Sequence, residues 1–133
     1  MTETSDPSPS GPDAGPVRLS LPASPRYLAA ARVVATSLGA ESGLSVDDLE
    51  DLRLGVNELV SLLVESGDPG DRVELEFDAL GSSITVRGTR SGAAQDAIEV
   101  DELTARIVEA VADHHVIDGS SFSLTKASSL RDQ

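Results

Sequence analysis

The residues most able to take part in chemistry lie on one acidic stretch of the chain. Residues 47–66 read DDLEDLRLGVNELVSLLVES, and their leucines and valines recur at the spacing of an amphipathic helix. Glu58 could act there as a general base if it were buried, and a solvated surface glutamate is the plainer alternative. Asn57 and Ser61 share a helix face, so they could hold a metal or form a polar stripe with Arg53. This helix must therefore position the candidate chemistry.

Two adjacent histidines, His114 and His115, are the other residues that could bind a metal. Neighbouring side chains on a helix diverge by about 100°, and no second ligand cluster accompanies this pair. The chain has no cysteine, so disulfides and cysteine-ligated metals are excluded. We therefore predict no metal site, and we interpret the pair as histidines at a helix end, where the helix dipole favours them.

The composition indicates one acidic, compact domain. With 133 residues the chain has room for a single core. Ten basic residues against 23 acidic ones give a net charge of -13, which opposes binding to nucleic acid or to an anionic membrane surface. No apolar run approaches the roughly 20 residues of a membrane span, and no signal-peptide pattern is present. We expect a cytoplasmic protein whose macromolecular partner is another protein.

Proline and small polar residues predict where ordered structure begins and ends. Residues 1–16 contain four prolines among serine, aspartate and glycine, a composition that cannot bury enough apolar surface to offset chain entropy. We predict a disordered tail there, one domain over residues 17–127, and a short C-terminal tail over residues 128–133.

Hydrophobic periodicity predicts a two-layer α+β sandwich, with a mostly antiparallel sheet of about four strands covered by about three helices. The second helix opens with Ser45 and has Asp48 three residues later, which is a capping-box pattern. Gly39 is expected to end the first helix. The predicted elements are strands over 17–22, 73–78, 84–87 and 122–126, helices over 24–39, 45–66 and 100–113, and a loop over 88–94.

The order of these elements and three short phrases together resemble one known family. The phrases are Leu21-Pro22-Ala23, Asp51-Leu52-Arg53-Leu54-Gly55-Val56-Asn57-Glu58, and Gly119-Ser120-Ser121-Phe122 leading to Lys126. Over residues 17–127 the chain resembles the RsbW-type anti-sigma factors and serine-protein kinases of the GHKL ATPases, in their divergent actinobacterial branch. The resemblance implies a Bergerat fold and a homodimer that holds a sigma factor away from RNA polymerase. It also implies a STAS-domain antagonist that competes for the same surface.

The resemblance assigns roles to single residues. Glu58 matches the general base with which active members use ATP and Mg²⁺ to phosphorylate the STAS protein on serine. The family's Mg²⁺ ligand falls on Leu62, which has no oxygen for a hard cation. The family's adenine-reading aspartate falls on Gly88 and its first glycine on Arg90, so only the second glycine, Gly92, is kept. These departures imply that ATP and Mg²⁺ are not cofactors of this chain.

Charged residues elsewhere support the same interpretation. Glu99, Asp101 and Glu102 stand at the start of the last helix, where the family binds phosphate, and they would repel a triphosphate. Arg32 matches a first-helix arginine that touches the sigma factor in the family, and an ordinary surface arginine paired with an acid is the alternative. Lys126 is interpreted as structural, because a phosphate role requires the phosphate site.

We therefore expect an anti-sigma-factor-like regulator that sequesters a sigma factor by protein–protein binding and has no kinase activity. An active serine-protein kinase that uses Glu58 as its base, with ATP and Mg²⁺, is the alternative. A dimeric interaction module without a sigma partner is a second alternative.

Overall fold

The structure is a computed structural model that describes residues 15–68, 70–92 and 98–129. Apart from residues 15 and 16, the predicted N-terminal tail lies outside the described residues, and so do residues 130–133. The elements in chain order are β1 (Val17–Pro22), the 3₁₀ helix η3 (Pro25–Tyr27), α1 (Leu28–Glu41), α2 (Val46–Glu65), β2 (Arg72–Leu80), β3 (Ser83–Ser91), α3 (Glu102–Val111), β4 (His114–Asp118) and β5 (Ser121–Ala127).

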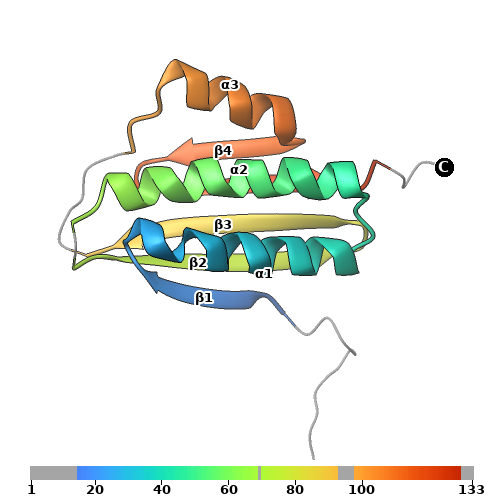
Figure 1. The fold of residues 1–133 in the computed structure, drawn as a ribbon, viewed down its shortest axis with the longest axis horizontal. Helices are drawn as coiled ribbons and strands as arrows, with labels where there is room; N and C mark the ends of the chain where they lie inside the picture. Colours follow the sequence, from blue (N-terminus) through green and yellow to red (C-terminus); the bar gives the residue numbers. More distant parts are fainter. Residues whose placement is uncertain (1–14, 69, 93–97, 130–133) are drawn as a thin grey trace, which may run out of the picture.

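The strands form one antiparallel sheet in the order β1-β2-β3-β5-β4. α1 and α2 lie side by side over one face of this sheet, and α3 lies next to α2 at the edge formed by β4 (Figure 1). The predicted α+β sandwich is confirmed, but the described sheet has five strands rather than about four. No helix among the described residues is long and apolar enough to cross a membrane.

The additional strand, β4, begins directly after the range predicted for the third helix, 100–113. α3 ends at Val111 because Ala112 adopts an extended backbone, with φ −95° and ψ 143°. His114 and His115 therefore belong to a strand, where neighbouring side chains point to opposite faces. The interpretation as helix-end histidines is wrong. The run from His114 to Asp118 was missed because it is short and shows no alternation of polar and apolar residues.

The third helix also turns a different face to the core than predicted. The periodicity predicts that Leu103, Ile107, Ala110 and Val111 point inward. Val111 is buried as predicted, but the other buried residues are Thr104 and Val108. Leu103 is 69% exposed. Both stripes of this helix carry apolar residues, so periodicity alone could not choose between them.

β3 continues through Ser91, so the predicted loop is wrong over residues 88–91, and residues 93 and 94 of that loop lie outside the described residues. Gly88 and Arg90 continue the inward alternation of Ile84 and Val86. The apolar alternation does not reveal this part of the strand, because a glycine and a charged residue stand at the inward positions. The consequence is that Gly88 and Arg90 face the helix layer instead of a solvent-exposed loop.

The junction between α1 and α2 is tighter than the sequence indicates. Gly39 does not end α1, which continues to Glu41. A Cβ built at Gly39 would lie 2.9 Å from methyl groups of both Leu49 and Leu52, so the glycine allows the two helices to approach closely. The predicted capping box is confirmed, because the Ser45 side chain accepts from the Asp48 amide and the Asp48 carboxylate accepts from the Ser45 amide.

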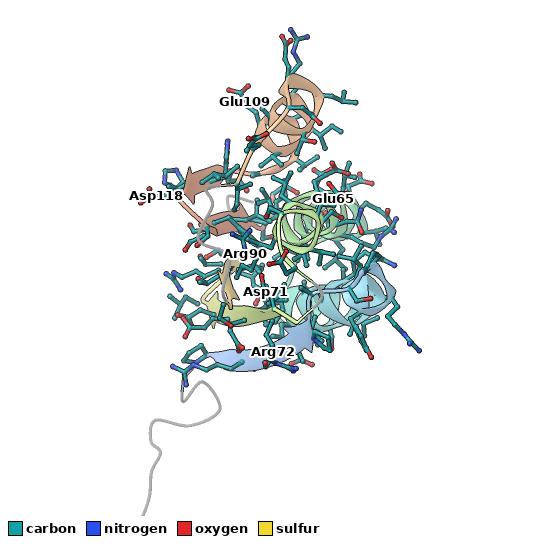
Figure 2. All side chains as sticks on the ribbon, turned by 90° about the vertical axis from the view of Figure 1, so that its left-hand side faces the viewer. Glu65, Asp71, Arg72, Arg90, Glu109 and Asp118 are labelled. Atoms are coloured by element: carbon teal, nitrogen blue, oxygen red, sulfur yellow. The ribbon has the colours of Figure 1, made fainter. Side chains whose placement is uncertain are left out.

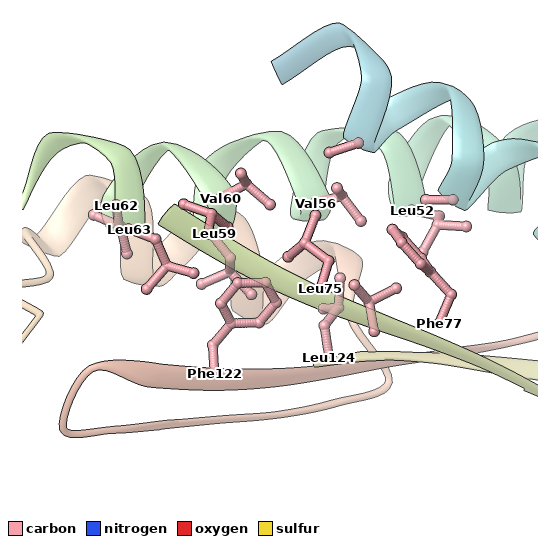
Figure 3. Close-up of a cluster of buried hydrophobic side chains, with 14 of the residues drawn as sticks. Leu52, Val56, Leu59, Val60, Leu62, Leu63, Leu75, Phe77, Phe122 and Leu124 are labelled. Atoms are coloured by element: carbon pink, nitrogen blue, oxygen red, sulfur yellow. The ribbon is translucent and has the colours of Figure 1, made fainter. Parts of the chain in front are cut away.

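The core lies between the sheet and α2. Figure 3 shows α2 side chains packed against side chains of the strands, including Phe77 and Leu124. Leu52, Leu59 and Leu63 of α2 are fully buried in this cluster. Truncating one such leucine costs about 2–5 kcal/mol, so this helix is held firmly in place. The polar residues of α2 are therefore carried by a fixed element.

Candidate functional site

α2 places the candidate base beside a position with no metal ligand. Glu58 is half-buried, and its side chain makes no hydrogen bond or ion pair with the described residues. Leu62, one turn further along the same helix, is buried in the hydrophobic cluster. A general base needs orientation as well as a suitable pKa. The described surroundings of Glu58 provide neither an orienting group nor an oxygen ligand at Leu62.

The alternative metal pair is also occupied by other contacts. The Asn57 amide oxygen accepts a hydrogen bond of 2.7 Å from Nη1 of Arg32. A guanidinium at this position opposes a cation on the same oxygen. No group of three or more histidine, aspartate or glutamate side chains that could hold a metal occurs among the described residues. In this structure the Asn57 amide oxygen is therefore a hydrogen-bond acceptor for Arg32.

At Gly88, where the resemblance places an adenine-reading aspartate, the space for a side chain is already filled. Gly88 lies opposite Phe122 in the sheet. A Cβ built at Gly88 would overlap Cε2 of the Phe122 ring and would lie 2.8 Å from its Cζ and 3.0 Å from Cδ2 of Leu75. The glycine thus allows Phe122 to pack against the bare backbone of β3. An aspartate side chain has no room here.

Two residues further along β3, Arg90 points into the molecule. Its side chain is 0% exposed and faces the buried carboxylate of Asp71, with 3.8 Å between Nε and Oδ2. Nη1 of Arg90 donates a hydrogen bond to Oγ of Ser66, just beyond the end of α2. Figure 2 looks onto this end of the molecule and shows Arg90 and Asp71 next to each other. The position to which the resemblance assigns the family's first glycine therefore holds one member of a buried ion pair.

The one glycine of that motif that the chain retains, Gly92, also touches this ion pair. Gly92 has φ +152°, and a Cβ built on it would overlap the Asp71 carboxylate. The structure thus gives Gly92 a packing role against Asp71.

The start of α3 is occupied by the chain's own carboxylate. Asp101 is the N-cap residue, and its Oδ1 accepts a 2.7 Å hydrogen bond from the backbone amide of Thr104. That hydrogen bond lowers the pKa of the Asp101 carboxyl below its usual 3.8. Glu99 and Glu102 are exposed nearby. One amide that a phosphate would need is taken, and the surrounding charge is negative.

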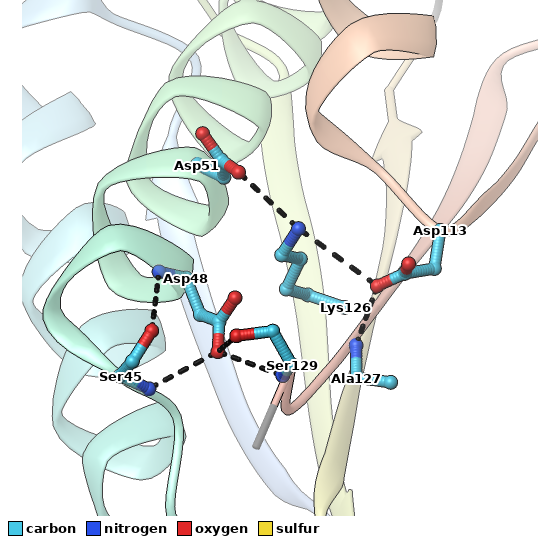
Figure 4. A network of polar contacts seen from close by, with 7 residues as sticks. All are labelled: Ser45, Asp48, Asp51, Asp113, Lys126, Ala127 and Ser129. Atoms are coloured by element: carbon cyan, nitrogen blue, oxygen red, sulfur yellow. Dashed lines mark hydrogen bonds and ion pairs between the residues drawn. The ribbon is translucent and has the colours of Figure 1, made fainter. Parts of the chain in front are cut away.

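Lys126 lies near the N-terminal half of α2, away from Arg90, and its contacts link elements of the fold. Its Nζ lies 3.3 Å from a carboxylate oxygen of Asp51 and 3.9 Å from one of Asp113. The Asp113 carboxylate also accepts from the amide of Ala127 (Figure 4). Lys126 thus ties β5 to α2 and to the connection between α3 and β4.

The N-terminus of α2 holds the segment that follows β5. Oδ2 of Asp48 accepts from the amide of Ser45 at 3.1 Å and from both the amide and the hydroxyl of Ser129 at 3.0 Å (Figure 4). Burial alone would raise the pKa of Asp48, but these hydrogen bonds outweigh burial and lower it to about 2. Asp48 therefore joins the C-terminal segment to a helix end.

A surface groove lies around Arg32 between α1 and α2. It has a volume of about 410 Å³ and is lined by Arg32, Glu50, Asp51, Arg53, Leu54 and Asn57. Arg53 forms a 2.7 Å ion pair with Glu50 at its rim. Leu54 is 42% exposed, and Val33 on α1 is 64% exposed. The groove combines charged groups with apolar side chains, as protein-binding surfaces do.

The five-stranded antiparallel sheet with α1 and α2 over one face defines an α+β sandwich, the class of fold expected for an ATPase-like domain. Comparison with protein families agrees with this class, because the model of the histidine kinase-like ATPase domain matches residues 21–115. The chain belongs to the histidine kinase-like ATPase domain family, within the GHKL superfamily. No curated protein matches the chain.

Sequence reasoning missed the two polar pairs that matter most in this region, Arg90 with Asp71 and Arg32 with Asn57. One signal was available for the first pair. The inward alternation of Ile84 and Val86 continues to Gly88 and Arg90, and a buried arginine requires an acidic partner. No comparable signal identified Asn57 as the partner of Arg32, because the two lie on different helices.

Proposed function

We propose that this chain is a non-catalytic member of its family that acts by binding another protein, as an anti-sigma factor does. In this proposal a sigma factor is sequestered by the α1–α2 surface, and a STAS-domain protein or another signal releases it. One observation carries the non-catalytic part. The positions that would contact nucleotide and Mg²⁺ are filled by the chain's own side chains, at Leu62, Gly88 and Arg90.

The energetic argument concerns what ATP would have to displace. Moving the Phe122 ring from Gly88 would disturb the core, and such overpacking typically costs about 1–3 kcal/mol. Separating Arg90 from Asp71 would leave a buried carboxylate without its partner, at a cost of about 3–5 kcal/mol. Leu62 supplies no oxygen to Mg²⁺ in return. The free-energy balance is therefore against binding of ATP in the way that the family binds it.

The groove between α1 and α2 supports the protein-binding part. The Asn57 amide oxygen accepts from one nitrogen of Arg32 and orients its guanidinium. The groove also holds Arg53 and the carboxylates of Glu50 and Asp51, so it offers charges of both signs to a partner. Leu54 adds exposed apolar area within the groove, and Val33, next to Arg32 in the sequence, is also exposed on α1. An oriented arginine beside aliphatic side chains is typical of an interface hot spot.

The proposal is tested with the full chain and the sigma factors and STAS-domain proteins of its own host. Affinity capture followed by titration of each purified candidate is expected to identify at least one sigma factor. Arg32→Glu is expected to weaken that complex at least about tenfold, because it reverses the charge at the proposed centre.

Arg106→Glu is the matched control. Arg106 is 74% exposed on α3, away from the groove, so the same charge change should leave affinity within about twofold. If no sigma factor or STAS protein binds, the proposed function is wrong. If a sigma factor binds but the two variants behave alike, the proposed contact surface is wrong.

A further inference from the structure

The buried chamber around Arg90 has the features of a binding site for a planar cation. Its walls come from the end of α2, the turn before β2 and the end of β3, and they contribute Ser66, Gly67, Asp71 and Gly92. We propose that this chamber is a guanidinium-binding site and that Arg90 is its built-in occupant. A site that takes adenine in the family would then take a cation in this chain.

The polar atoms of the chamber are arranged around the guanidinium. Ser66 Oγ accepts from Nη1 of Arg90 and donates its own proton to the Leu62 carbonyl oxygen at 2.7 Å, so its lone pair is directed at the arginine. Oδ2 of Asp71 is held by the amide of Asp68 at 3.0 Å and faces Nε of Arg90. These contacts fix a neutral acceptor and an anion in place.

Two glycines shape the chamber walls. A Cβ built at Gly67 would lie 2.6 Å from Cδ of Arg90 and 3.1 Å from Oδ2 of Asp71. A Cβ built at Gly92 would overlap the Asp71 carboxylate. Backbone therefore packs directly against both members of the ion pair, and a side chain at either position would displace one of them.

Burial and charge determine which ligand the chamber accepts. Asp71 is 4% exposed, so its charge is poorly screened by water. An anionic phosphate is repelled by this carboxylate, whereas a cation with several in-plane donors can donate to Ser66 Oγ and form an ion pair with Asp71. Guanidinium meets this requirement better than ammonium, because its donors lie in one rigid plane. The chamber thus selects guanidinium or amidinium groups and disfavours nucleotides.

The test is chemical rescue of Arg90→Ala in the full chain, followed by thermal unfolding. The variant is expected to have a lower Tm than the natural chain. Guanidinium chloride at ten times its dissociation constant should then raise the Tm of the variant by about 4 °C, in a saturable manner. Sodium chloride at equal concentration should not. The natural chain, whose site is full, should show no rise.

Arg106→Ala is the control, because it removes an exposed arginine and opens no chamber. If Arg90→Ala does not fold, the recovery of soluble protein on refolding with and without millimolar guanidinium replaces Tm, and Arg90→Lys provides a second variant. Rescue by guanidinium alone supports the proposal. Equal effects of guanidinium and sodium, or tighter binding of ATP than of guanidinium to the opened chamber, overturn it. Neither result depends on whether a sigma factor binds elsewhere.

Discussion

Asp48 allows the stability of this fold to be related to one carboxylate. Its Oδ2 accepts three hydrogen bonds, from Ser45 and Ser129, and these join the start of α2 to the segment after β5. Replacing Asp48 with asparagine preserves shape and removes the charge that strengthens all three bonds. We expect Asp48→Asn to destabilise the fold at neutral pH.

The expected magnitude follows from the lowered pKa. The carboxyl has a pKa of about 2 in the folded chain and an ordinary value of 3.8. At about 1.36 kcal/mol per pKa unit this difference corresponds to about 2 kcal/mol. Because the folded pKa is the lower one, the stabilisation is fully present above pH 3.8 and is lost as the pH falls toward 2.

Urea denaturation of the natural chain and of Asp48→Asn, repeated from pH 7 downward, measures this contribution. The gap in unfolding free energy should be about 2 kcal/mol at pH 7 and should narrow below pH 4. Asp47→Asn is the matched control, because Asp47 is exposed in the same first turn. It should cost about 0.5 kcal/mol through the helix dipole. Equal costs for the two variants, or a gap that stays constant in acid, would refute the reasoning.

Two further substitutions test the interior of the fold. Gly88→Asp should lower the free energy of unfolding by at least about 3 kcal/mol without creating ATP binding, since the new side chain overlaps Phe122 and buries a charge. Ser91→Asp, on the exposed face of β3, is the control and should change this free energy by no more than about 0.5 kcal/mol. Equal urea midpoints for the two variants would contradict the packing at Gly88. Lys126→Gln should lower the free energy of unfolding by about 1 kcal/mol, because Asp51 and Asp113 then have no cation between them. Arg106→Gln removes an exposed ion pair and should lower it by less than about 0.5 kcal/mol in the same assay. A Lys126 cost no larger than that of Arg106 would argue against its bridging role.

The sequence predicts those parts of the fold that depend on local signals. The capping box of Ser45 and Asp48 follows from neighbouring residues and was placed correctly, and the strands predicted over 73–78 and 84–87 lie within β2 and β3. β4 was missed because its five residues show no alternation of polar and apolar side chains, and they are extended only through pairing with β5. Gly39 shows a related limit, since its role depends on contact with Leu49 and Leu52 of another helix.

The sequence predicts which residues of the resembled family the candidate site lacks. It does not predict which side chains fill the space that they leave. Leu62, Gly88 and Arg90 could be recognised as departures from the resembled family from the printed residues alone. What fills the vacated space depends on contacts between elements, as with Phe122 against Gly88 and Asp71 beside Arg90. Sequence spacing carries no information about such contacts. The structure thus explains how the departures are accommodated in a folded core.

The most direct test of the central claim is calorimetric titration of the full chain with Mg-ATP at neutral pH. The account predicts no saturable heat up to millimolar nucleotide, because the chain's own side chains fill the space at Gly88 and Arg90 and because Leu62 offers no oxygen to Mg²⁺. One-to-one binding in the micromolar range that weakens in Glu58→Gln would contradict it, and would favour the kinase alternative.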